Sequence, residues 1–393
     1  MNTRHSLPRL CGALVPTACL IAAAAGCSQL LDWTLVDRPS TDAGGTETAA
    51  AGEAGSAPNA CDTVLVPPPP DGGSAGGTDK FVVALSTFLP IFDGDGGGVP
   101  VGLNLDRACT DSTATASCVL EGGRFTSDLP AGVDLGAKSI FDLLTRLEES
   151  ATTGGAKFIT AKTINDRLAN GNFGLVAEVS SYNGEANDGE VALALYPAVI
   201  RTRPPPGTVS TSPNDSWTLD RSGLITVNGV VGPKFIATRA YISEMVLVAE
   251  FDAFAMDLAI QDRVPFALKL SDVHVRAQVA KDALQSRKLV QGVLAGRWSV
   301  DDFLASIGST TVSTDQGEGQ QVCLSPYLQS FLGTVCAGRD LASTPALDGK
   351  SSPCTSMGMS LSFETYSIKS RGAAGDPRDA APPCLDASAF SCD

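Results

Sequence analysis

This sequence has little histidine, few aromatic residues and few charged ones. Its 393 residues include two His, and aromatic and charged residues make up 6% and 18% of the chain. Two His exclude a metal centre built from several histidines and an acid–base pair of two histidines. Hydrophobic residues nevertheless make up 43% of the chain, so a packed core is expected and global disorder is excluded.

Positive charge is also scarce. There are 28 Lys and Arg against 43 Asp and Glu, which gives a formal net charge of −15. A nucleic-acid-binding protein needs a basic surface for the phosphates, so we expect no nucleic-acid partner. The chain also lacks a P-loop and a Gly-x-Gly-x-x-Gly motif after a strand, so we expect no nucleotide cofactor.

The N-terminal segment predicts export. Arg4 and Arg9 precede an apolar stretch over 10–25, and small residues then lead to Cys27. This order is typical of a secretory signal peptide, and the apolar run is short for a membrane span. A cleaved signal in which Cys27 has no special role would give the same pattern.

The residues Ala24-Ala25-Gly26-Cys27 resemble the lipobox of bacterial lipoproteins. The resemblance implies cleavage before Cys27, acylation of its thiol, including palmitate, and attachment to a lipid bilayer through that group. The residue that follows the cysteine is Ser28 and not an Asp. The resemblance therefore also implies an outer-membrane or cell-surface location.

The composition divides the chain into four regions. We expect a signal peptide over 1–26 and, over 27–79, the lipidated cysteine with a Gly/Ala/Ser/Thr/Pro-rich disordered tether. A β-rich globular domain follows over 80–370. A Pro/Ala-rich tail over 371–393 contains the last two cysteines.

Eight cysteines remain besides Cys27 and the two in the signal peptide. An even number in an exported chain predicts disulfides, and the absence of Cys-x₂₋₄-Cys spacing disfavours zinc. Because short loops close at the lowest entropic cost, we expect three pairs close in sequence, and the fourth by elimination. The expected pairs are Cys109–Cys118, Cys323–Cys336, Cys384–Cys392 and Cys61–Cys354.

The periodicity predicts a mainly β (α+β) fold, an antiparallel β-sandwich or jelly roll with a few short helices. Met357, Met359, Leu361 and Phe363 alternate as one face of a strand would. Strands are expected over 81–92, 173–182, 190–196, 217–219, 224–227, 235–242, 245–251, 255–260, 266–279, 289–298 and 357–368. Helices are expected over 139–149, 163–170, 299–307 and 325–335.

Three motifs of the body resemble a group of uncharacterised exported lipoproteins from GC-rich bacterial genomes. They are Gly102-Leu-Asn-Leu-Asp106, Tyr182-Asn-Gly-Glu-Ala-Asn-Asp188 and Gly292-Val-Leu-Ala-Gly-Arg-Trp298. The resemblance would cover most of the body, and it implies no activity and no functional residues.

Carboxylates in two loops suggest calcium binding. Asp93 and Asp95 stand at alternate positions before a glycine turn, as in a calcium loop, and Asp106 and Asp111 could complete a looser site. The third and last ligand positions of an EF-hand are missing, which favours an acidic Gly-rich loop as the explanation of the pattern. Asp188 is a second candidate, with plain turn chemistry as its alternative.

One strand pair holds the candidate catalytic residues. Glu250 and Asp252 share a face of a predicted strand, as the paired acids of a glycoside hydrolase would. His274, the one histidine outside the signal peptide, shares a face with Asp272 and Arg276. A solvated strand face is the alternative for both sets.

Aromatic residues near turns could form a platform for a sugar, or they could pack in the core. The candidates are Tyr182, Tyr196, Trp217 and Trp298. We therefore expect a non-catalytic binding or envelope-structural module with a protein or glycan ligand. It would need no cofactor, and calcium is the one ion that its residues could hold. The alternatives are a jelly-roll polysaccharide hydrolase and a calcium-stabilised adhesion module.

Overall fold

A computed structural model describes most of the body of the chain. The described residues are 66–71, 76–90, 102–111, 115–129, 132–142, 161–200, 211–258, 266–309, 311–312, 320–321, 323, 327–349, 351–375 and 392. All of them belong to one compact unit, Ser56–Asp393. The signal peptide, Cys27, Cys61, Asp93, Asp95 and Cys384 lie outside the described residues.

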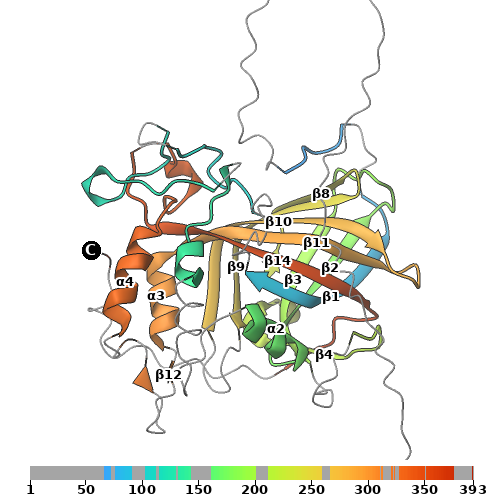
Figure 1. Cartoon of the computed structure of the whole chain (residues 1–393). Helices are drawn as coiled ribbons and strands as arrows, with labels where there is room; N and C mark the ends of the chain where they lie inside the picture. Colours follow the sequence, from blue (N-terminus) through green and yellow to red (C-terminus); the bar gives the residue numbers. More distant parts are fainter. Residues whose placement is uncertain are drawn as a thin grey trace, which may run out of the picture. The chain divides into compact units, whose positions relative to one another are not determined.

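One large, mainly antiparallel sheet forms the body, which confirms the prediction of a mainly β fold with few short helices (Figure 1). Its long strands form two runs in chain order, and within each run every strand is antiparallel to the next. They are β1 (Asp79–Pro90), β2 (Gly174–Tyr182), β3 (Ala192–Ile200), β8 (Arg239–Ser243), β9 (Val246–Leu258), β10 (Phe266–Lys281), β11 (Arg287–Ser299) and β14 (Ser356–Ile368); β14 pairs with both β11 and β1.

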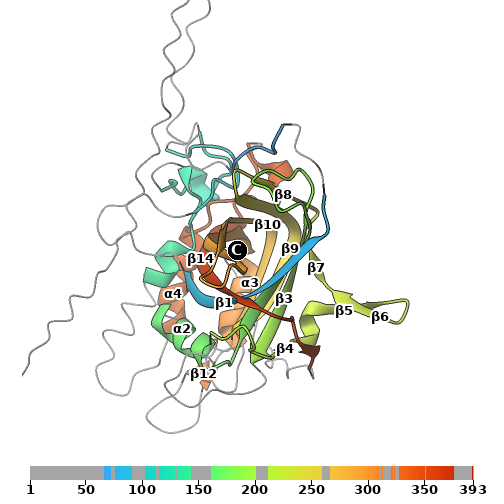
Figure 2. The same cartoon turned by 90° about the vertical axis from the view of Figure 1, so that its right-hand side faces the viewer.

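The sheet curves until β8, at one end of it, lies beside the segment 188–191 that leads into β3 (Figure 2). β7 (Phe235–Ile236) pairs with β3, and Asp188 forms an antiparallel bridge with Ile242 of β8. The carboxylate of Asp188 is buried and accepts hydrogen bonds from backbone N–H groups, those of Gly76, Asn183 and Glu190. Asp188 therefore stabilises a turn through these hydrogen bonds. The contacts of β7 and Asp188 bring two walls of the one sheet to face each other across the core.

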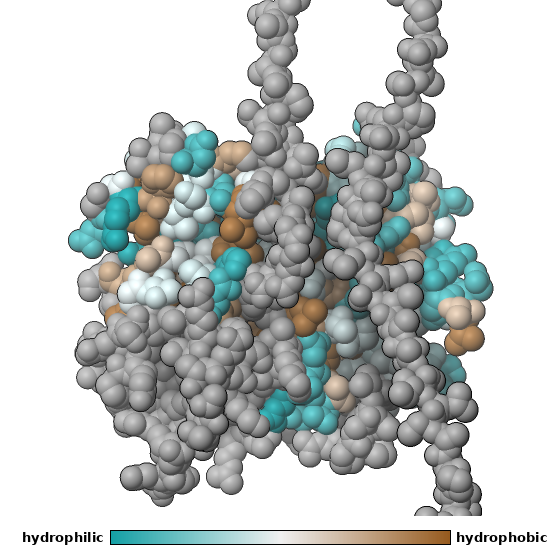
Figure 3. All heavy atoms as spheres, in the orientation of Figure 1, coloured by the Kyte–Doolittle hydropathy of each residue, from teal (hydrophilic) through white to brown (hydrophobic). Residues whose placement is uncertain are grey.

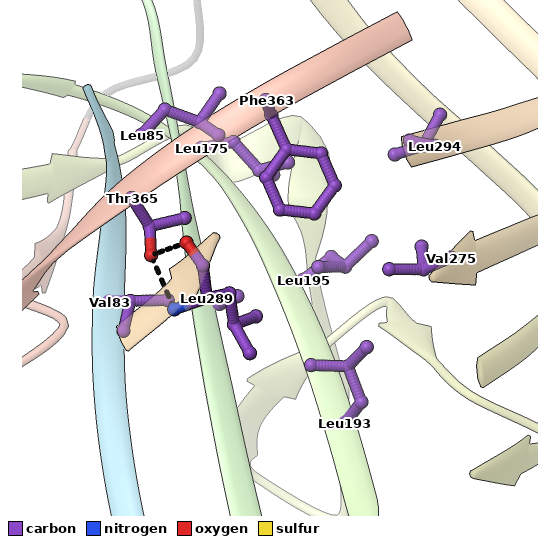
Figure 4. Close-up of a pocket in the computed structure, with 11 residues that line it drawn as sticks. Val83, Leu85, Leu175, Leu193, Leu195, Val275, Leu289, Leu294, Phe363 and Thr365 are labelled. Atoms are coloured by element: carbon purple, nitrogen blue, oxygen red, sulfur yellow. Dashed lines mark hydrogen bonds between the residues drawn. The ribbon is translucent and has the colours of Figure 1, made fainter. Parts of the chain in front are cut away.

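Apolar side chains fill the space between the walls. Met357, Met359, Leu361 and Phe363 all lie in the core, as their alternation predicts. A cavity of about 20 Å³ remains there, about the volume that one water molecule needs (Figure 4). The hydroxyl of Thr365 at its edge accepts a hydrogen bond from Leu289 N–H and donates one to Leu289 C=O.

Helices pack at the ends of the long strands. α2 (Ala161–Ala169) buries Ile164 and Leu168, and Gly171 follows it with a φ of 68°, as expected for a glycine after a helix. α3 (Val300–Ser309) begins where Ser299 Oγ accepts a hydrogen bond from Asp302 N–H. α4 (Tyr327–Ala337) lies beside α3 in Figure 1. No helix among the described residues is long and apolar enough to cross a membrane.

The remaining elements are short. The sequence predicts β4 (Trp217–Leu219) and β5 (Leu224–Val227) but misses β6 (Val230–Pro233), which pairs with β5. It also divides β9 into two strands, whereas pairing with β10 continues through the expected break at Ala253. The others are β12 (Thr311–Val312), β13 (Gln320–Gln321), β15 (Ala373–Ala374), η2 (Glu121–Gly123), η4 (Arg221–Gly223) and η6 (Pro345–Leu347).

A layer that we call the cap covers the outward face of β11 and β14. It consists of the described parts of 102–142 and 338–355. Leu103, Leu105 and Leu341 pack against Val293 and Ala295 of β11.

The cap backbone also lies directly on β14. Gly358 C=O accepts a hydrogen bond from Ala137 N–H, and a Cβ at Gly358 would come within 2.5 Å of the Asp134 carbonyl group. Only glycine fits at this contact.

The disulfides differ from the predicted pairs. Cys118 is bonded to Cys354, and Cys336 of α4 is bonded to Cys392; Cys109 and Cys323 are also disulfide-bonded. All four expected pairs are therefore wrong, although these six cysteines do form disulfides. Proximity in sequence failed because the cap places the segment around Cys118 beside 353–354, where Cys354 N–H donates to Val119 C=O.

We expect Gly358→Ala to lower the free energy of unfolding by about 1–3 kcal/mol, because the new methyl group overlaps backbone that cannot move independently. Gly189→Ala is the matched control, since a Cβ there meets nothing within 4 Å. Urea denaturation followed by circular dichroism measures both. Equal midpoints for the two variants would show that the cap backbone is not in close steric contact with β14.

Candidate functional site

The cap is joined to the sheet by the fully buried side chain of Arg297 on β11. Its Nε donates to Asp272 Oδ2 at 2.9 Å, and Nη1 and Nη2 donate to the two oxygens of Asp348 at 2.9 and 2.5 Å. The guanidinium also donates to Ala342 C=O and Leu105 C=O, both in the cap. Burial lowers the pKa of Arg297, but these hydrogen bonds outweigh it and the net shift is upward. The group is a permanently charged structural contact.

Asp272 lies between Arg297 and the candidate histidine. It sits at an irregularity between β10 and β11 with a φ of 49°, and its Oδ1 is 3.2 Å from His274 Nε2. Burial raises the pKa of Asp272, but the hydrogen bonds from His274 and Arg297 produce a net downward shift. Asp272 is therefore ionised at neutral pH.

The structure brings two of the three candidate catalytic residues side by side. Glu250 on β9 is directly opposite His274 on β10, and its carboxylate is 3.8 Å from Arg239 Nη1. Asp252 is exposed two residues further along β9. All three lie on the outward face of the sheet, whose inward face is the packed core, so a solvated strand face describes them better than a cleft.

Four carboxylates, two of them buried and two half-buried, lie close to one another in the cap, and the sequence singled out only one of them. This acidic group is Asp106, Asp128, Asp134 and Asp340. Asp340 accepts hydrogen bonds from Gly136 N–H and Gly358 N–H, one on each oxygen. Nothing in the sequence spacing links the other three to Asp106, because chain reversals within the cap bring them together.

Burial raises the pKa values of these carboxyls. It raises the pKa of Asp128 to about 7 and of Asp340 to about 7, and the pKa of Asp134 well above its usual range. Repulsion from Asp106 adds to each shift, and repulsion from Asp128 adds to those of Asp134 and Asp340. The leading causes of these three shifts are burial, backbone or hydroxyl hydrogen bonds and neighbouring carboxylates. The nearby cation Arg297 is already bound to Asp272 and Asp348.

Four side chains at this site each leave one oxygen buried without a hydrogen-bond donor. These oxygens are Asn104 Oδ1, Asp106 Oδ2, Asp128 Oδ1 and Asp134 Oδ1. Among the described residues, no three side chains of His, Cys, Asp or Glu form a group that could hold a metal ion.

The candidate aromatic platform is part of the core. Tyr182, Tyr196, Trp217 and Trp298 are each at most 1% exposed, which favours packing over sugar binding. Trp298 stacks edge-to-face with Phe266 and Phe303 between the sheet and α3.

The hairpin of β5 and β6 carries an exposed apolar face that the sequence did not predict. Its turn is Asn228-Gly229, with φ values of 51° and 80°, as a two-residue hairpin requires. Ile225, Val227 and Val230 share one face and are 49%, 56% and 70% exposed. Figure 2 shows the hairpin projecting from the sheet, and brown apolar surface is scattered over the face seen in Figure 3.

The comparisons with known proteins found no match: no family model, no curated protein and no solved structure is similar to this chain. The site is therefore interpreted from its own chemistry.

The acidic group predicts an unusual dependence of stability on pH when a chelator removes divalent cations. A carboxyl whose pKa is raised in the folded state binds more protons folded than unfolded between about pH 4 and 7, so stability falls as the pH rises through this range. For the fully buried Asp340 the slope is on the order of 1 kcal/mol per pH unit. Thermal unfolding of the chelated chain from pH 5 to 7 measures it.

Asp128→Asn should flatten this slope because one of the titrating groups is gone. Asp252→Asn, an exposed carboxylate on β9, is the matched control and should leave the slope unchanged. A wild-type stability that rises steadily from pH 5 to 7 would contradict the interpretation.

Proposed function

We propose that this protein is an exported, lipid-anchored and non-catalytic module of the cell envelope. The long-range disulfide Cys118–Cys354 carries the proposal, because it joins segments 236 residues apart and such bonds persist in oxidising compartments. The signal peptide over 1–26 supplies the route of export, and the lipobox ending at Cys27 supplies the anchor.

The ion-pair and hydrogen-bond contacts of the candidate catalytic residues support a non-catalytic role. Glu250 is close to Arg239, and His274 contacts Asp272, which in turn is bound by Arg297. A glycoside hydrolase needs two carboxylates facing one another across a bound sugar, one of them free to donate a proton. An outward-facing row of ion pairs suits a stable surface better.

A binding role is supported by the β5–β6 hairpin, and we infer that its partner is the bilayer itself. Residues 222–233 contain no ionisable side chain, while exposed Arg221 and Lys234 stand immediately on either side. An apolar tip with cations at its base suits a membrane interface with anionic headgroups, where a second contact strengthens a lipid anchor. The rest of this acidic chain would be repelled by the same surface.

The anchor is tested by replacing the acylated cysteine. We expect cells that express the wild-type chain to incorporate labelled palmitate into it, and Cys27→Ser to abolish the label because no thiol remains to be acylated. Cys19→Ser, within the apolar part of the signal, is the matched control and should stay labelled. A wild-type chain without label would rule out lipidation.

The hairpin contact is tested with an added tryptophan on the acylated chain. On vesicles of phosphatidylethanolamine and phosphatidylglycerol with brominated acyl chains, we expect the fluorescence of Val230→Trp to be quenched after subtraction of the wild-type signal. Leu284→Trp is the control, at a turn position that is 72% exposed in the wild type. Equal fluorescence of Val230→Trp with and without bromine, with the chain dimeric by sedimentation, would assign the apolar face to a second copy.

A further inference from the structure

We propose that the cap binds a calcium ion through Asn104, Asp106, Asp128 and Asp134. This inference goes beyond the envelope role and does not depend on the lipid anchor. The ligands would be the four buried oxygens that accept no hydrogen bond, Asn104 Oδ1, Asp106 Oδ2, Asp128 Oδ1 and Asp134 Oδ1.

Each of these side chains is oriented by its other polar atom. Asn104 Nδ2 donates to Ala108 C=O at 2.7 Å, and Asp106 Oδ1 accepts from Ala108 N–H at 2.8 Å. Asp128 Oδ2 accepts from Thr110 N–H at 2.6 Å. These hydrogen bonds restrain the orientation of each side chain and leave its remaining oxygen without a partner.

Asp134 ties the second half of the site to the first. Its Oδ2 accepts from Leu105 N–H at 2.5 Å and from Asp106 N–H at 3.3 Å, so its carboxylate lies against the backbone of the 104–110 loop. Asp128 is held to the same loop through Thr110. All four oxygens thus belong to one loop or to carboxylates hydrogen-bonded to it.

The unpaired oxygen of Asp134 points to a ligand independently of the clustering of charge. The residue is 0% exposed, so neither solvent nor a protein donor reaches Oδ1. Burying a carboxyl oxygen without a hydrogen-bond partner is costly, and a bound cation would offset that cost. The neutral amide of Asn104 likewise leaves a buried oxygen that accepts no hydrogen bond, although it adds no charge.

The ligand chemistry selects calcium. All four atoms are hard oxygens, whereas zinc prefers nitrogen and sulfur, and magnesium requires near-ideal octahedral geometry. Calcium accepts six to eight oxygens in flexible arrangements, and amide oxygens count as fully as carboxylates. In the chain without an ion the three carboxylates do not form a group that could hold a metal, and Asp106 and Asp128 repel Asp134. A cation would draw them together.

The test compares calcium binding by the full chain and by an isosteric variant after removal of divalent ions with EDTA. Isothermal titration calorimetry with CaCl₂ gives the Kd, and differential scanning calorimetry gives the Tm. For the wild type we expect the Tm to rise by about 5 °C when free calcium is about a hundred times the Kd. Asp134→Asn should weaken binding at least about tenfold.

Asp134→Asn also separates an ion ligand from a purely structural carboxylate. In EDTA the variant should be at least as stable as the wild type, because the amide oxygen still accepts from Leu105 N–H and the repulsion is gone. Asp252→Asn is the control with the same chemical change and should keep the full calcium response.

Three results would overturn the proposal. The first is a wild-type chain with no binding heat and no change in Tm at about 10 mM CaCl₂, above the usual range for extracellular sites. The second is an equal response to MgCl₂, which would indicate general screening of charge. The third is an Asp134→Asn variant that binds calcium as tightly as the wild type.

Discussion

The five hydrogen bonds of the buried Arg297 guanidinium hold the cap on the sheet. The side chain leaves β11, forms ion pairs with Asp272 on β10 and Asp348 in the cap, and donates to the carbonyls of Leu105 and Ala342. All of its donor groups are used, and its bidentate contact fixes the orientation of Asp348. Removal of one partner from such a pair typically costs 3–5 kcal/mol, because the other charge stays buried.

The position of the acidic group follows from this contact. Arg297 donates to the carbonyl of Leu105, and Leu105 N–H donates to Asp134, so one residue of the cap connects the ion-paired carboxylates to the acidic group. Arg297 is shared between Asp272 and Asp348 and is not free to neutralise Asp106, Asp128 or Asp134. The cap therefore concentrates most of the unusual electrostatics of the described chain. The closed sheet beneath it is a filled scaffold.

Local patterns predicted the elements well where one face of a strand or helix is buried. The alternation of β14 and the helix start at Ser299 are both confirmed, because they depend on neighbours within a few residues. The short strand β6 was missed because its side chains are exposed and show no contrast between two faces. Asp106 was recognised as a possible ion ligand, but only with Asp93 and Asp95 as its expected partners.

The cysteine pairs and the acidic group could not be derived in the same way. The packing of one chain segment on another brings Cys118 close to Cys354, and Asp106 close to Asp340. Loop-closure entropy depends on separation in sequence alone and does not predict such packing. The sequence by itself determined the β-rich class, the acidity, the scarcity of histidine and the signal and lipobox pattern, since these depend on composition and local spacing. Only the tertiary structure decided which cysteines bond, which carboxylates are buried together and which oxygens lack a donor. Those properties depend on distances between chain segments far apart in sequence.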